Sequence, residues 1–97
     1  MEPEFEELFH AALAEWPDQI DVSEGVIHNE DGGRFDRLVS IKDAIEERLI
    51  FSQRLDLIEI NWAIFTVLHK ASMAMNKINT KDIRREMVKF FFERNKN

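Results

Sequence analysis

The sequence predicts an all-α protein: a small four-helix bundle around a buried central helix, with a long loop or short β-hairpin between the first and second helices. Apolar residues recur with helical period in four separate stretches. Gly and Pro are scarce, with three and two copies. The run from Asp56 to Asn76 is apolar over more than half of a helical circumference, which indicates a helix surrounded by other elements. We expect one helical domain over residues 1–97.

A first helix is predicted from Pro3 to Trp16. Pro3 suits the first helical position, where its missing N–H is not needed, and Pro17 ends the helix. The acidic residues that follow Pro3 favour the positive end of the helix dipole. Its apolar stripe follows the helical spacing throughout: Phe5, Leu8, Phe9, Ala12, Leu13 and Trp16.

The segment from Pro17 to Phe35 has no helical pattern. Ile20 and Val22 alternate with polar residues, and a Gly-Gly pair after Asp31 is a tight-turn signal. Two structures fit residues 26–39: a short β-hairpin from Val26 to Val39, or a long surface loop. Loops of this length are often functional.

A second helix is predicted to start near Ser40, with Asp43 completing a capping box, or as early as Asp36. Between Ile50 and Leu55 the apolar direction rotates, so we expect a break near Ser52 to Asp56. The alternative is one continuous helix from Ser40 to Asn76, roughly 55 Å long, which would imply a dimer.

The third helix is the apolar run itself, with Asp56 expected as its cap and Glu59 bonding back. A fourth helix should open at Asn79 or Thr80. Its predicted apolar stripe is Ile83, Met87, Phe90 and Phe91. Its other face is basic and is expected to pack beside the acidic first helix.

Charge is distributed unevenly along a chain whose net charge is −6. Residues 1–36 hold eleven acidic residues and one basic residue, whereas residues 70–97 hold three acidic and eight basic residues. The N-terminus lacks the features of a signal peptide, and no apolar run approaches the ~20 residues of a membrane span. The chain has no cysteine, which excludes disulfides and thiol chemistry and fits a cytoplasmic protein.

No residue pattern indicates catalysis, a metal or a cofactor. Glu7 and His10 are spaced as in a di-iron bundle, but no second such pair exists. The acidic turn before Gly33 does not supply the ligands of a calcium loop. The three histidines stand outside any hydrolase or phosphate-binding motif. We therefore expect that the protein is not an enzyme and that it needs no cofactor.

The sequence instead favours a non-enzymatic acidic module that binds a basic protein, since complementary charge speeds association. A narrower hypothesis is an inhibitor or immunity-type protein that neutralises a nuclease toxin. The expected partner-binding residues are Asp18, Asp21, Glu24, Glu30, Asp31 and Asp36, placed on a loop. The alternative is a homo-oligomeric structural or regulatory module, such as a homodimer, that would contact nucleic acid through its basic C-terminal helix, which includes Arg84 and Arg85. The acidic chain makes nucleic acid the weaker partner.

Overall fold

The computed structural model describes residues 3–23 and 30–94, except for the side chains of residues 3, 30–32, 90–92 and 94. These residues form four α-helices, one 3-10 turn and two short strands. In chain order the elements are α1 (Pro3–Leu13), β1 (Gln19–Asp21), α2 (Glu30–Phe51), η1 (Leu55–Leu57), α3 (Ile58–Ser72), β2 (Lys77–Asn79) and α4 (Thr80–Arg94).

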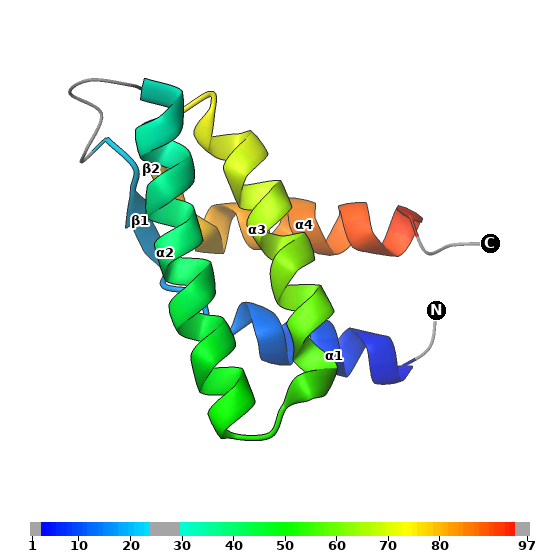
Figure 1. The fold of residues 1–97 in the computed structure, drawn as a ribbon. Helices are drawn as coiled ribbons and strands as arrows, with labels where there is room; N and C mark the ends of the chain where they lie inside the picture. The colour runs from blue at the N-terminus through cyan, green and yellow to red at the C-terminus, as the bar shows by residue number, and fades with distance from the viewer. Residues whose placement is uncertain (1–2, 24–29, 95–97) are drawn as a thin grey trace.

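The helices are arranged in two layers (Figure 1). Helices α2 and α3 form an antiparallel hairpin in front, and α1 and α4 cross behind it in opposite directions. The shortest extent of the molecule, 20 Å, matches two layers of helices about 10 Å thick. The strands lie behind α2 at one edge, where α4 packs on them.

The two strands form an antiparallel pair between segments far apart in the sequence, with Ile20 opposite Ile78. Both isoleucines are buried. The pairing continues beyond the strands, because the Thr80 amide donates to the Asp18 carbonyl (2.8 Å) and the Val22 amide donates to the Asn76 carbonyl (2.8 Å). The alternation of Ile20 and Val22 was visible in the sequence, but three residues are too few to predict a strand.

Helix α3 is not surrounded as the sequence suggested. Its buried residues, together with the last residue of η1, form a single stripe: Leu57, Asn61, Ile64, Phe65, Leu68 and Ser72. Trp62 on another face is 47% exposed. The core lies between the two layers, and α4 contacts the strands rather than α3 as its main partners. A bundle around α3 is therefore not confirmed, although the mostly helical class is.

Helix α2 begins ten residues before the expected Ser40, at Glu30. A hairpin or loop over residues 30–39 is therefore wrong, while residues 24–29 lie outside the described part. The Ser40 cap is wrong for the same reason. Tertiary contacts outweigh the poor helix propensity of the Gly-Gly pair, because Arg34 in this first stretch donates to the Met75 carbonyl (2.8 Å) and to the carbonyl of Ser72.

The break between α2 and α3 is confirmed, and a continuous helix is wrong. The chain turns at Gln53, whose φ of 60° lies in the left-handed region. The Gln53 amide donates to the Ile50 carbonyl (3.0 Å) and the Arg54 amide donates to the Leu49 carbonyl (2.7 Å). These two bonds are the pattern of a Schellman motif, which ends a helix by satisfying its last carbonyls.

The predicted helix starts have mixed outcomes. Asp56 does not cap α3, since its carboxylate instead accepts bonds from the Arg54 guanidinium (Nη2 to Oδ2, 3.0 Å). Helix α4 starts at Thr80 as predicted. Asn79 caps it, with its Oδ1 accepting from the amides of Lys81 (3.0 Å) and Asp82 (3.4 Å).

Candidate functional site

An acidic stripe runs along the outer face of α2. Asp36, Asp43 and Glu47 are spaced at i, i+7 and i+11, and all three are exposed. The buried stripe of the same helix has identical spacing two residues later: Leu38, Ile45 and Leu49. Two residues correspond to a rotation of 200°, so the acids point away from the core. The stripe is roughly 17 Å long at 1.5 Å per residue.

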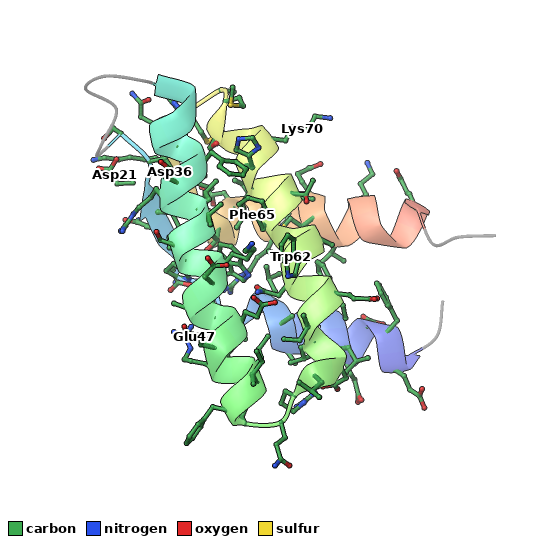
Figure 2. The ribbon with its side chains drawn as sticks, viewed as in Figure 1. Asp21, Asp36, Glu47, Trp62, Phe65 and Lys70 are labelled. Carbon is green, nitrogen blue, oxygen red and sulfur yellow. The ribbon has the colours of Figure 1, made fainter. Side chains whose placement is uncertain are left out.

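Trp62 lies on α3, across the hairpin from Asp36 and Glu47 of this stripe (Figure 2). Its indole Nε1 donates to Oε1 of Glu46 on α2 (3.0 Å). The ammonium of Lys42 lies 3.5 Å from the ring centroid. These two contacts hold the ring in one orientation while almost half of the residue stays exposed. An aromatic side chain fixed at the surface in this way is typical of an interface anchor.

Lys42 is a buried lysine, with its ammonium enclosed by Trp62 and Phe65. The ring centroid of Phe65 is 5.1 Å from the ammonium. Its charge is balanced by Asp43, whose Oδ1 lies 3.3 Å from Nζ. Burial of a lysine is tolerated only when the charge is paired, and here carboxylate and ring faces share that role.

The aromatic surface continues toward the start of α2 through Phe35, which is exposed. Its ring meets those of Phe65 (5.6 Å between centroids) and His69 (5.2 Å) edge-on. Arg34 holds this end of the hairpin closed, because its guanidinium donates to the carbonyl of the last residue of α3, to the Met75 carbonyl beyond it and to Oδ1 of Asn76. The exposed rings therefore rest on a supported backbone.

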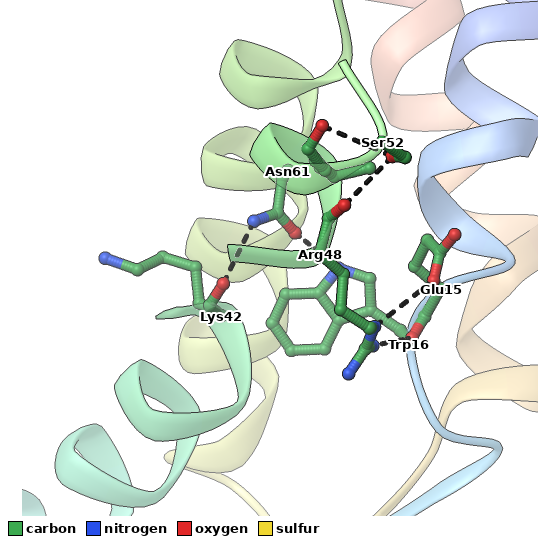
Figure 3. A network of polar contacts seen from close by, with 7 residues as sticks. Glu15, Trp16, Lys42, Arg48, Ser52 and Asn61 are labelled. Atoms are coloured by element: carbon green, nitrogen blue, oxygen red, sulfur yellow. Dashed lines mark hydrogen bonds and ion pairs between the residues drawn. The ribbon is translucent and has the colours of Figure 1, made fainter. Parts of the chain in front are cut away.

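A polar network behind this face joins the turn after α1 to α2 and α3 (Figure 3). The Trp16 indole donates to Oδ1 of Asn61 (3.0 Å), and Nδ2 of Asn61 donates to the Lys42 carbonyl (3.2 Å). Farther along α2, the Arg48 guanidinium pairs with Glu15 (Nε to Oε2, 3.6 Å). Because Asn61 holds the backbone of Lys42, the network positions the lysine that lies on Trp62.

The acids predicted to bind a partner do not gather in one place. Asp18 pairs with two cations of α4, Lys81 (3.3 Å) and Arg84 (3.5 Å), so its single negative charge is outweighed within the chain. Glu24 lies outside the described residues, and Glu30 and Asp31 belong to the first turn of α2 rather than to a loop.

Of the predicted acids, Asp36 lies on the acidic stripe. Asp43, Glu47 and Trp62 were missed as site residues. The spacing of the acids at i, i+7 and i+11 was a signal that could have revealed the stripe once α2 was extended back to Glu30.

Asp21 lines an open polar pocket of about 430 Å³ between the sheet and α2, together with Arg37 and Lys77. The pKa of Asp21 is lowered from its ordinary value of 3.8, mainly because the Ser23 hydroxyl and then the Ser23 amide donate to the carboxylate. The nearby charges of Lys77 and Arg37 act in the same direction. This carboxylate is thus occupied by local contacts.

Comparison with protein-family models, curated proteins and solved structures finds no match to this chain. Among residues 3–23 and 30–94, no three acidic or histidine side chains gather as a metal site. In the same residues, no helix is both long and apolar enough to cross a membrane. We therefore infer function from the chemistry of the surface.

Proposed function

We propose that the protein is a non-enzymatic binding module that holds a basic protein against the outer surface of the α2–α3 hairpin. This binding face consists of Asp36, Asp43, Glu46, Glu47 and Trp62. The observation that carries the proposal is the half-exposed Trp62, which Glu46 holds in one orientation, on the same hairpin as a row of outward-facing carboxylates.

The two parts of the face have different roles. The acids attract a partner of opposite charge and raise the association rate, an effect that salt weakens. Trp62 supplies apolar contact area in a ring that is already ordered, so little side-chain entropy is lost on binding. Neither role requires a reactive group.

The narrower form of the proposal is an inhibitor or immunity-type protein that neutralises a nuclease toxin. Nucleases bind a polyanion, so their active sites are basic and fit an acidic row. The net charge of −6 and the small size of the chain support this form.

Association kinetics with a panel of purified cationic nucleases test the proposal. We expect the triple variant Asp36→Asn, Asp43→Asn and Glu47→Gln to bind about tenfold more slowly at low salt. The matched control is Glu4→Gln, Glu6→Gln and Glu7→Gln on α1, where three exposed acids are neutralised. Equal slowing by both variants would refute a specific face and leave only general attraction between opposite charges.

A second candidate function, self-association, is favoured by an apolar cluster at the turn between α2 and α3. Ile50, Phe51 and Leu55 are exposed there, Phe51 by 93%. Contact with nucleic acid through α4 has less support, because two of its bases, Lys81 and Arg84, are paired with Asp18.

A further inference from the structure

We propose that Trp62, Glu46 and Asp43 form a receptor for an arginine side chain of the partner. The guanidinium would stack on the exposed part of the Trp62 ring and donate to the neighbouring carboxylates. This inference rests on the proposed function, because it names the group through which a basic partner is recognised at the same face.

The receptor is ordered before the partner arrives. The bond from Trp62 Nε1 to Glu46 (3.0 Å) fixes the ring plane and also places a carboxylate at its edge. Asp43 lies one turn away on α2, with 56% of its side chain exposed. A cation on the ring would therefore have carboxylates within reach of its N–H groups.

The molecule already binds one cation by this chemistry. The Lys42 ammonium sits 3.5 Å from the Trp62 centroid and 3.3 Å from Asp43. Lys42 is buried, whereas Trp62 is 47% exposed, so the lysine leaves much of the indole open to solvent. The charge of Lys42 is balanced by Asp43, and Glu46 adds negative charge at the edge of the ring.

Arginine fits this receptor better than lysine. A guanidinium is planar and weakly hydrated, so it can lie flat on an indole and still donate several hydrogen bonds in the plane. An ammonium is a compact, strongly hydrated charge that cannot stack. The receptor should therefore distinguish two partners of equal charge.

Two synthetic peptides of equal length and charge serve as probes: five arginines alternating with glycine, and five lysines alternating with glycine. Binding to the full chain is measured by calorimetry at low salt. We expect the arginine peptide to bind at least about threefold more tightly, since a cation on an exposed ring adds a small but measurable free energy.

Three variants test which residues produce the preference for the arginine peptide. Trp62→Leu and, independently, Glu46→Gln should abolish the arginine preference, and the second variant leaves the indole ring in place. Met73→Ala, which removes an exposed apolar side chain at the other end of the hairpin, is the control and should keep the preference. Circular dichroism verifies that each variant is folded.

The outcomes separate this inference from the proposed function. Equal binding of the two peptides, or a preference that survives both Trp62→Leu and Glu46→Gln, would overturn the arginine receptor while acid-dependent binding stands. If neither peptide binds at low salt, the acidic face itself fails, and the receptor fails with it.

Discussion

Asn61 is a fully buried polar residue of α3 whose side chain bonds to α2 and to the turn after α1. Its carbonyl oxygen accepts from the Trp16 indole in that turn, and its amide donates to a backbone carbonyl of α2. A buried amide is tolerated when both ends are hydrogen-bonded, as here, and its geometry then selects one packing of the helices. This role could not be predicted, because an asparagine within an apolar helix has no distinguishing sequence pattern.

Replacing Asn61 should be costly for this reason. We expect Asn61→Ala to lower the free energy of unfolding by about 3 kcal/mol, since it leaves the Trp16 N–H unpaired in the core and removes the side-chain bond to the Lys42 carbonyl. Urea denaturation measures the change. The control is Thr66→Ala, which removes an exposed bond to the Trp62 carbonyl in the same helix and should cost less than about 1 kcal/mol. Equal losses in the two variants would show that the buried pair is not specifically required.

At the scale of elements, the α2–α3 hairpin owes its turn to local backbone bonds rather than to glycine. Gln53 adopts a left-handed conformation (φ 60°) that glycine adopts without steric cost. The Schellman bonds around it and the packing of both helices hold the residue there. Gln53 is therefore a less favourable residue than glycine for the left-handed conformation that this turn requires.

Gln53→Gly should relieve this cost. We expect the free energy of unfolding to rise by about 1 kcal/mol, because a side chain in the left-handed region costs roughly 1–2 kcal/mol and glycine loses somewhat more entropy on folding. Thermal unfolding measures the shift. Gln53→Ala is the matched control: it shortens the side chain without relieving the backbone, and it should leave stability nearly unchanged. If Gln53→Gly lowered the free energy of unfolding instead, contacts of the Gln53 side chain would stabilise the fold by more than its left-handed backbone conformation destabilises it.

Elements with strong local signals could be predicted from the sequence. Helix α1 follows from Pro3 and a regular apolar stripe, and α4 from the polar residues at its start. The β1–β2 pair could not be predicted, because each strand has three residues and its partner lies more than fifty residues away. The first turns of α2 were missed because Gly32 and Gly33 favour a turn, whereas Arg34 binds the end of α3.

The acidic character of the candidate site could be predicted from the sequence, but the position of its residues on the fold could not. Acidic charge was visible in the composition, and Asp36, one of the acids expected to bind a partner, is exposed on α2. Asp18 and Asp21 were expected to face a partner, yet their carboxylates are engaged by α4 and by Ser23. Whether a surface acid is engaged within the chain depends on contacts between distant segments, which a single sequence does not display.

At the scale of the whole molecule, charge and apolar surface are separated along the hairpin. The acidic stripe ends one turn before Phe51, which continues the same face of α2 at i+15 from Asp36. At the turn, Arg54 is paired with Asp56 and Arg48 with Glu15. The apolar cluster of Ile50, Phe51 and Leu55 is therefore bordered by balanced charges in a chain of net charge −6.

This cluster is where two copies of the chain can meet with the least repulsion. Three exposed apolar side chains on each copy form a contact below the size of a stable dimer interface, so we expect weak, concentration-dependent association in sedimentation experiments. The double variant Phe51→Ser and Leu55→Ser should stay monomeric at every concentration. The control, Met73→Ser with Met75→Ser, removes exposed apolar side chains at the opposite end of the hairpin and should leave the association intact. A wild-type chain that stays monomeric at millimolar concentration, or a control that dissociates like the Phe51 variant, would show that the turn is not the contact.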